Sequence, residues 1–426
     1  MLQHRLRPGP QSGPGAPEPV AIGVTYPQGF QAGTAGCGIK AFTAGATAIP
    51  SGQRDDLAVL FSERPCDAGG VFTSNRVKAA PVIIDQLHLQ QNRVQALVVN
   101  SGNANACTGA QGFRDALQMA KLTADRLELD PPQVLVSSTG VIGRFLPMTA
   151  VKTGIRLACD SLSARGGEAA AKAIMTTDTV PKTAELELEV GGVQVRVGGM
   201  CKGSGMIHPN LATMLAYVVT DAAVEPGWAA AAVKPIADRS FNQVTVDGDS
   251  STNDSFLLLA NGAAGNPPIA AGSAESKQLE EAVLEVARAL ARKIAQDGEG
   301  ATKLITVRIA GAPDDQQARL AARSVASSSL VKTAIHGGDP NWGRIVCALG
   351  YSGSELAIDT LTVQVAGVTV FDKGAGVEAD LDRVRRAFEQ PEIEIHAALG
   401  MGEGKAEAWG CDLSEEYVHI NADYTT

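Results

Sequence analysis

Hydrophobic and polar residues follow two different periods along this chain, and these periods predict both helices and strands. Strict alternation through "ELELEVGGVQVRVGG", with Gly191-Gly192 between the two arms, predicts a β-hairpin. Apolar residues recur at helical spacing in "FRDALQMAKLTADRL" (113–127) and "KQLEEAVLEVARALARKI" (277–294). We expect each of these segments to form a helix with one face on the core.

Short apolar runs elsewhere predict buried strands that end in polar turns. Residues 94–99 lead into a polar loop, and "QVLVSSTGVIG" leads into a Ser/Thr/Gly turn. The segments "LITVRIAG", "LTVQVAGVTVF" and "EIEIHAALG" alternate with period two and are each expected to form a strand. Because the order of elements is mixed, we expect an α+β fold of layered mixed or antiparallel sheets with helices, rather than a doubly wound parallel sheet.

Length and charge narrow the class of protein. A chain of 426 residues is expected to form two domains or one large layered unit. Its composition, 45% hydrophobic and 19% charged, is typical of a globular protein. The formal net charge is −10 and no basic stripe interleaves with aromatic residues, so nucleic acid is not expected as a main partner.

The N-terminal segment and the lengths of the apolar runs indicate in which cellular compartment the protein is expected. No apolar run reaches the roughly 18–20 residues of a membrane span, so no membrane association is expected. Residues 1–22 are rich in Pro and Gly and lack the apolar stretch of a secretory signal. They are interpreted as a disordered leader, and the predicted location is the cytoplasm.

Cysteines and acidic loops give no sign of a metal or cofactor. The seven cysteines form no CxxC pair, which argues against a disulfide framework or a zinc site. Cys107 is a candidate nucleophile, but a small buried residue is the favoured interpretation. "DGDSSTND" (247–254) lacks the glutamate of an EF-hand, so we interpret it as a loop packed near the catalytic centre. No nucleotide-binding glycine pattern occurs either.

The segment "CKGSGMIHPNLATMLAYVVTDA" (201–222) holds the main candidate for chemistry. A glycine-rich loop with Lys202 leads through Pro209-Asn210 into an apolar run that starts at Thr213. A β-branched residue at the start of a strand is common, and that interpretation is favoured from the residues alone. Alternatively, the Thr213 hydroxyl attacks the Ala212 carbonyl, the acyl group moves from N to O, and hydrolysis leaves Thr213 as a new N-terminus. Its own α-amine can then act as general base.

An ordered series of segments, from about Gly23 to the C-terminus, resembles the ornithine acetyltransferases, also called glutamate N-acetyltransferases. The segments are "NSGNANACTG", "SSTGVIG", "IMTTDTVPK", "KGSGMIHPNLATML", "RSFNQVTVDGDSSTND", "DGEGATKLI", "GGDPNWGRI" and "YVHINADYTT". The resemblance implies a self-processing fold with an N-terminal threonine nucleophile, cut between Ala212 and Thr213. It implies chains 23–212 and 213–426, two of each forming a heterotetramer.

The resemblance also implies a reaction. Acetyl passes from N2-acetyl-L-ornithine onto a threonine and then to L-glutamate in a ping-pong cycle. Ornithine and N-acetylglutamate are released, and some members of the family accept acetyl-CoA as donor. No metal or cofactor is implied.

Individual positions match the family's site residues. Thr213 matches the nucleophile, and Thr139 with Gly140 matches the oxyanion-hole pair, which stabilises developing negative charge. Substrate contacts match Thr176, Lys202, Thr213, Glu299, Asn421 and Thr426. Thr177 and Thr179 lie close enough to Thr176 to be alternatives, and His208 is given no role. We expect Tyr417, Val418 and Ile420 to anchor the C-terminus as a strand.

Two other functions remain open at this stage. One is a self-processing aminopeptidase or amidohydrolase of the same architecture, in which water replaces glutamate as acceptor. The other is a non-enzymatic binding protein that keeps the fold. Release of ornithine that depends on glutamate separates the transferase from the hydrolase, and an unprocessed native protein would favour the binding protein.

Overall fold

The computed structural model describes residues 21–45, 54–91, 93–208 and 214–423. The predicted cleavage junction Ala212–Thr213, the predicted contact Thr426 and residues 1–20 of the predicted leader lie outside these ranges.

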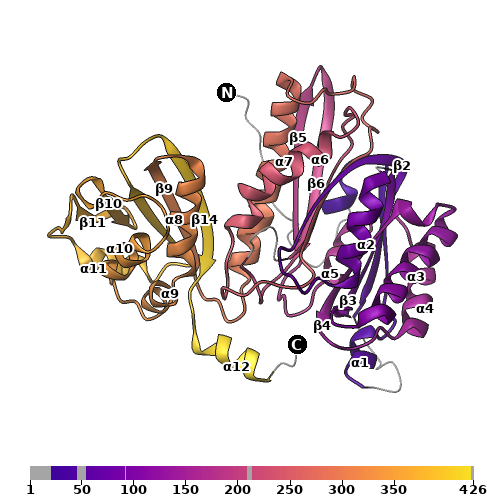
Figure 1. Cartoon of the computed structure of the whole chain (residues 1–426), viewed down its shortest axis with the longest axis horizontal. Helices are drawn as coiled ribbons and strands as arrows, with labels where there is room; N and C mark the ends of the chain where they lie inside the picture. The colour runs from indigo at the N-terminus through magenta and orange to yellow at the C-terminus, as the bar shows by residue number, and fades with distance from the viewer. Residues whose placement is uncertain (1–20, 46–53, 92, 209–213, 424–426) are drawn as a thin grey trace, which may run out of the picture.

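The larger of two units contains an eight-stranded sheet in the order β4-β3-β2-β8-β7-β6-β5, with β1 paired to β2 (Figure 1). Two of its pairs, β3 with β4 and β7 with β8, are parallel, and the others are antiparallel. The strands are β1 (Phe30–Ala35), β2 (Leu57–Phe72), β3 (Val94–Asn103), β4 (Val134–Val141), β5 (Lys182–Val190), β6 (Val193–Lys202), β7 (Leu215–Thr220) and β8 (Ser255–Ala260).

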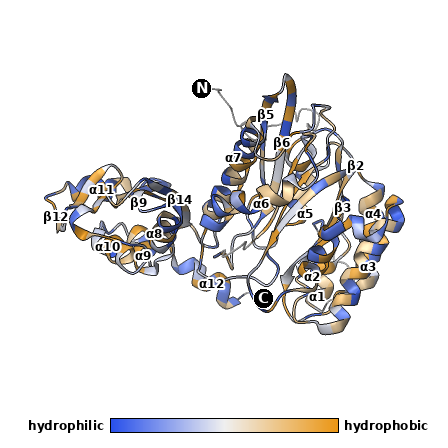
Figure 2. Cartoon of the chain, turned by 45° about the horizontal axis from the view of Figure 1, so that its top comes forward, coloured by the Kyte–Doolittle hydropathy of each residue, from blue (hydrophilic) through white to orange (hydrophobic). Residues whose placement is uncertain are grey.

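Helices with one apolar face cover this sheet. Hydrophilic and hydrophobic residues alternate along α3, as its sequence spacing predicts (Figure 2). The helices are α1 (Ile39–Thr43), α2 (Ala80–His88), α3 (Gly109–Leu127), α4 (Met148–Asp160), α5 (Gly167–Ala173), α6 (Trp228–Asp238) and α7 (Ala274–Gln296). Short 3-10 turns occur at Gly23–Thr25, Leu89–Gln91, Pro131–Gln133 and Phe241–Gln243.

The three largest hydrophobic clusters among the described residues of this unit divide it into layers. One cluster lies between α3, α4 and strands β2–β4, and another lies between strands β5–β8 and helices α6 and α7. The third cluster lies between the two halves of the sheet. Strand β2 belongs to both halves, because its first part pairs with β3 and its last part with β8. The layers are therefore helix, sheet, sheet, helix.

Strand β7, which follows the candidate Thr213, is buried on both faces. Ala216 and Val218 belong to the cluster beneath α6 and α7, whereas Tyr217 and Val219 belong to the cluster between the sheet halves. A strand buried on both faces reads as a continuous apolar run instead of an alternation. This explains the abrupt apolar run in the sequence.

The smaller unit is formed by the C-terminal part of the chain and lies beside the larger one (Figure 1). Its six-stranded sheet has the order β12-β11-β10-β13-β9-β14 and one parallel pair, β9 with β13. The elements are β9 (Leu304–Ala312), α8 (Asp315–Ser327), α9 (Ser329–His336), α10 (Trp342–Gly350), a 3-10 turn (Ile358–Thr360), β10 (Thr362–Val365), β11 (Val368–Asp372), β12 (Ala375–Gly376), α11 (Leu381–Ala387), β13 (Glu392–Ala398) and β14 (Gly404–Cys411).

One predicted strand is in fact a hairpin. The segment 361–371 forms β10 and β11, which pair in antiparallel fashion around Ala366-Gly367. Both turn residues have positive φ, 49° and 74°. The alternation continues through this two-residue turn, so the pattern alone did not indicate the break.

The prediction of a C-terminal strand is wrong. Residues Glu415–Asp423 form helix α12, in which Val418 is 63% exposed. Acidic residues in the first turn favour a helix, because its N-terminus carries partial positive charge. Gly300 has φ +68°, and a Cβ at this position would lie 2.5 Å from the backbone nitrogen of Tyr417. Glycine at position 300 therefore leaves room for the helix backbone. The helix therefore packs back across the loop that follows α7.

The predicted α+β class with layered mixed sheets is confirmed. The expected division at 212/213 does not separate the two units, because β7 and β8 lie in the middle of the larger sheet. Among the described residues, no helix has the length and apolar character needed to cross a membrane.

Candidate active site

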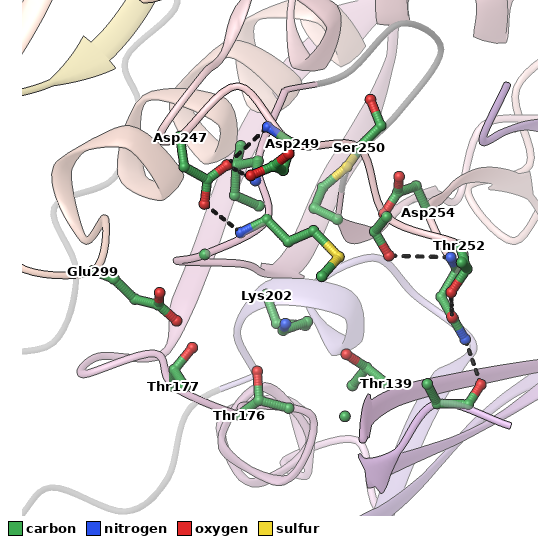
Figure 3. Close-up of a pocket in the computed structure, with 18 of the residues that line it drawn as sticks. Thr139, Thr176, Thr177, Lys202, Asp247, Asp249, Ser250, Thr252, Asp254 and Glu299 are labelled. Atoms are coloured by element: carbon green, nitrogen blue, oxygen red, sulfur yellow. Dashed lines mark hydrogen bonds between the residues drawn. The ribbon is translucent and has the colours of Figure 1, made fainter. Parts of the chain in front are cut away.

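A pocket of about 260 Å³ brings together residues from distant parts of the chain. It lies where β4, β6 and β7 meet the loop after α7 and helix α12. Of the residues predicted from the sequence, it is lined by Thr139, Gly140, Thr176, Lys202, Glu299 and Asn421. Figure 3 shows Lys202 in the middle of this pocket, between Thr176 and Thr177 below it and the 247–254 loop above it.

Thr139 and Gly140 lie near the end of strand β4, where it pairs with β3. Gly140 pairs with Gly102 in the parallel register and has φ +131°. A Cβ at Gly140 would lie 2.3 Å from the Gly102 carbonyl carbon and 2.5 Å from the Asn103 nitrogen. Only glycine fits there, and the backbone can approach a ligand closely. This geometry suits a group that stabilises an oxyanion.

Thr176 and Thr177 belong to the turn between α5 and β5. The Thr176 N–H donates to Asp178 Oδ2 (3.1 Å), and Lys40 Nζ donates to the carbonyl oxygen of Met175 (3.0 Å). Thr177 Oγ1 lies 2.7 Å from Ser204 Oγ. These contacts fix a turn that lines the pocket.

Of the two alternatives to Thr176, only Thr177 lines the pocket. The backbone N–H and hydroxyl of Thr179 both donate to the carboxylate of Asp297.

Lys202 is the last residue of β6 and pairs with Leu215 at the start of β7. Its side chain is buried, with a residue exposure of 8%, and it forms no ion pair within the described part of the chain. Asp178 is a near neighbour, because its Oδ1 accepts the N–H of Gly203, the residue after Lys202 (2.7 Å). Burial raises the pKa of Asp178, but the charges of Lys202 and Lys182 outweigh it and lower this pKa to about 2. A buried cation facing a pocket suits an anionic ligand.

Glu299 follows α7 and closes another side of the pocket. Its N–H donates to the Ser204 carbonyl oxygen (2.8 Å), and its Oε2 accepts from Asn421 Nδ2 (2.9 Å). A Cβ at Gly205 would lie 2.3 Å from this carboxylate. Glycine at 205 therefore lets the carboxylate lie against the loop that carries Lys202.

The 247–254 loop contributes most of its residues to the lining of the pocket. Asp247 accepts the N–H groups of Met206 (2.6 Å) and Ile207 (2.9 Å). Asn253 Nδ2 donates to the carbonyl oxygens of Ala104 (2.6 Å) and Ser138 (2.8 Å). The loop thus connects the segment upstream of the predicted cut with the end of β4. Among the described residues, no group of His, Cys, Asp and Glu could hold a metal ion.

Asp254 is an acidic pocket residue that the sequence did not single out. It is 2% exposed, lines the pocket, and burial raises its pKa well above the ordinary value. The next residue, Ser255, donates its N–H to the Met214 carbonyl oxygen (2.8 Å). Asp254 therefore lies close to the start of the candidate nucleophile's strand.

Two other residues considered in the sequence do not line this pocket. Cys107 is exposed, so its interpretation as a small buried residue is wrong; it occupies a turn with φ +57°. His208 contacts Thr245 Oγ1 (3.0 Å) and accepts from Arg323 Nη2 (3.1 Å). Burial, with the positive charge of Arg323, lowers the pKa of His208 to about 4.

Comparison with known proteins places this chain among close relatives. The arginine biosynthesis bifunctional protein ArgJ of Symbiobacterium thermophilum is 50% identical over 407 residues, which cover 96% of this chain and 99% of that protein. The protein of the same name from Dehalococcoides mccartyi is 47% identical over 403 residues, covering 95% and 97%.

A crystal structure of an ornithine acetyltransferase complexed with ornithine, from Mycobacterium tuberculosis, is 43% identical. It matches 45% of this chain and 97% of its own, with a TM-score of 0.40. The ArgJ family matches residues 38–426. Because this match and those of the two relatives extend over most of the sequence, the chain belongs to the ArgJ family.

Proposed function

We propose that this enzyme transfers acetyl from N2-acetyl-L-ornithine to L-glutamate through an acetyl-threonine intermediate on Thr213. Two relatives are named arginine biosynthesis bifunctional proteins, and in this proposal the chain is an acetyltransferase of the same pathway. Acetyl-CoA is a second donor to glutamate in this proposal. The observation that carries this proposal is the pocket at the start of β7. It brings together a glycine suited to oxyanion binding (Gly140), a buried cation (Lys202) and a carboxylate (Glu299).

The nucleophile is assigned from chain connectivity. Met214 lines the pocket, and Thr213 is the residue before it in the sequence. After the proposed cut, the α-amine of Thr213 would be the new N-terminus. An α-amine has a pKa of roughly 8, so it can take the hydroxyl proton near neutral pH.

In the first half-reaction, Thr213 Oγ attacks the acetyl carbonyl carbon. Thr139 and Gly140 stabilise the oxyanion, the bond from carbon to the ornithine nitrogen breaks, and that nitrogen receives the hydroxyl proton. In the second half-reaction, the amine of glutamate attacks the carbonyl carbon of the acetyl ester, the bond from that carbon to Thr213 Oγ breaks, and Oγ receives a proton from the glutamate nitrogen. Lys202 binds the α-carboxylate that both substrates carry, and Glu299 with Asn421 and Thr176 holds the remainder. Thr426 completes the substrate contacts in this proposal.

The size of the pocket supports a ping-pong order. Sites for drug-sized ligands have volumes of roughly 300–1,000 Å³. A pocket of about 260 Å³ is suited to one small amino-acid substrate at a time. Ornithine would then leave before glutamate binds, which requires the acetyl group to remain on the enzyme between the two steps.

The direct test is the intact mass of each chain after brief exposure to N-acetylornithine. The proposal expects an acetyl adduct on the fragment that begins at Thr213. Thr213→Ala is expected to abolish cleavage and transfer, whereas Thr213→Ser keeps a hydroxyl and retains part of each. Comparable transfer by Thr213→Ala would exclude Thr213 as nucleophile.

A second candidate function, a self-processing aminopeptidase or amidohydrolase, uses water as acceptor. Lys202 is buried and forms no ion pair with any described residue, which favours an amino-acid acceptor because it offers a site for the α-carboxylate. Incubation with N-acetylornithine, with and without glutamate, separates the two functions. Ornithine release that is independent of glutamate would favour the hydrolase.

We further propose that the processed enzyme is a heterotetramer of two chains of each kind, acts in the cytoplasm, and needs neither metal nor cofactor. Native mass spectrometry tests the stoichiometry. Full transfer activity after dialysis against a chelator is the expected result for the metal, and activity restored only by an added metal would contradict it.

A further inference from the structure

A buried group of two aspartates and one lysine lies directly behind the pocket. Lys182 Nζ contacts Asp178 Oδ1 at 2.7 Å and Asp297 Oδ2 at 2.5 Å. The side chains of Lys182 and Asp178 are both 0% exposed, and that of Asp297 is 8% exposed. Burying three charges is costly unless each is paired and hydrogen-bonded, as these are.

Asp178 joins two segments that line the pocket. Its Oδ2 accepts the N–H of Thr176 at 3.1 Å, and its Oδ1 accepts the N–H of Gly203 at 2.7 Å. Gly203 is bonded to Lys202 and has φ +152°, so the chain turns directly after the buried cation. One carboxylate therefore holds the backbone of two proposed substrate contacts, which come from different elements.

The charge of Asp178 also acts on Lys202 without occupying its ammonium group. The two side chains attract each other through space, yet no ion pair between them occurs among the described contacts. Asp178 can lower the cost of burying the Lys202 charge while that ammonium stays available to a ligand. Lys182 in turn keeps Asp178 ionised, since burial alone raises the pKa of the carboxyl whereas Lys202 and Lys182 lower it.

We propose that Asp178 is a positioning residue for the acetyl transfer, fixing Thr176 and Lys202 relative to each other so that both meet the same substrate. This inference rests on the proposed function, because it takes those two residues as substrate contacts. It adds a residue whose side chain acts through others and does not line the pocket.

Asp297 offers a matched control. Like Asp178, it is a buried aspartate that pairs with Lys182, but its other contacts are to Thr179, outside the pocket lining. Asp178→Asn and Asp297→Asn each remove one negative charge that contacts Lys182, and each keeps the shape of the side chain. A role in stability alone should make the two variants equivalent, whereas a positioning role should not.

The experiment compares the two variants with the parent enzyme in thermal unfolding and in steady-state kinetics with both substrates. We expect similar losses of thermal stability. Asp178→Asn should lower kcat/KM at least tenfold for N-acetylornithine and for glutamate, mainly through KM, while Asp297→Asn stays within threefold of the parent. Equal kinetic losses in the two variants, or a loss below threefold in Asp178→Asn, would overturn the inference.

Calorimetric binding of ornithine separates this inference from the proposed function. If the parent enzyme transfers acetyl and the two variants show equal kinetic losses, only the positioning role is contradicted. Parent enzyme that neither binds ornithine nor transfers acetyl would contradict both. Parent enzyme that binds ornithine without transfer would contradict the function, and a tenfold weaker affinity in Asp178→Asn alone would still support positioning.

A pH profile gives a readout that a purely structural role would not move. Lys182→Met removes the cation in direct contact with Asp178, so the pKa of that carboxyl should rise. The acid limb of kcat/KM should then move to higher pH, because the ionised carboxylate is the form that accepts both N–H groups. Lys182→Arg keeps the charge and should keep the parent profile. Uniform loss across all pH values in Lys182→Met would contradict the inference.

Discussion

Lys202 and Asp85 are both buried ionisable side chains, but their surroundings differ. Lys202 faces the pocket and has acidic neighbours on more than one side, among them Asp178 and Asp254. Asp85 is 0% exposed on α2, where Oδ1 accepts the Val136 N–H at 2.7 Å, while Oδ2 has no partner among the described residues. The first arrangement suits binding, and the second imposes a cost on the folded state.

Lys202→Met is expected to weaken the binding of both substrates. A charge-assisted contact is worth about 1.5–3 kcal/mol, which corresponds to roughly a ten- to hundredfold loss in kcat/KM for N-acetylornithine and for glutamate. Self-cleavage should largely survive, since it requires no substrate. Steady-state kinetics on the processed variant is the measurement. A loss confined to one substrate would mean that Lys202 binds a side-chain end instead of the shared α-carboxylate.

Asp85→Asn is expected to stabilise the protein at neutral pH. Burial raises the pKa of Asp85 well above its ordinary value of 3.8. A carboxyl with a raised folded pKa stabilises the fold below the unfolded pKa and loses that contribution as pH rises toward the folded pKa. The variant cannot ionise, so its advantage over the parent should grow between pH 4 and pH 7. Urea unfolding at both pH values checks this, and an advantage independent of pH would contradict it.

At the scale of elements, local patterns predicted most of the larger unit. The hairpin of β5 and β6 forms around Gly191-Gly192, and α3 and α7 cover the expected segments, because their apolar periods coincide with the faces that they bury. Helix α12 was not predictable in this way, since it buries none of its residues. Its position depends on tertiary contacts, such as the bond from Asn421 to Glu299 across 122 residues.

The residues of the candidate site also divide into those that local motifs indicate and those that depend on tertiary contacts. Thr139, Lys202 and Glu299 were identified because they lie in recognisable motifs. Asp178 was missed, although it lies in the quoted "TTDT" segment, because its function depends on where Gly203 and Lys182 come to lie in the folded chain. A local sequence pattern does not indicate such contacts between distant residues.

Removal of residues 415–426 is expected to reduce activity far more than stability. The deletion takes away Tyr417 and Asn421 from the pocket wall, and α12 contributes no buried residue to a core. We expect kcat/KM to fall at least tenfold and the melting temperature to stay nearly constant. Val418→Ser, at a position 63% exposed on the same helix, is the control and should leave both unchanged. A truncated enzyme with full activity would contradict the role of this segment.

At the scale of the whole molecule, the predicted cut falls within a single sheet. Residues before it supply β1–β6 and residues after it supply β7 and β8, which lie between β2 and β6. The backbone ladders β2·β8 and β6·β7 therefore cross between the two products.

The two chains are expected to remain associated after self-cleavage. Denaturing electrophoresis should show two bands, and N-terminal sequencing of one should begin at Thr213. Size-exclusion chromatography without denaturant should show both chains in one peak, because separation would break two backbone ladders and expose both hydrophobic clusters that β7 joins. A single full-length band from active enzyme would contradict processing, and separate peaks would contradict the association.

The central place of β7 and β8 also bears on the order of events during synthesis. A fragment that ended before β7 would present two unpaired edges, namely the last part of β2, which pairs with β8, and the side of β6 that pairs with β7. Such edges promote aggregation. Neither half contains the complete eight-stranded sheet without the other. We therefore expect folding of the intact precursor to precede the predicted cut, and halves produced as separate polypeptides to be poor starting material for reconstituting the enzyme.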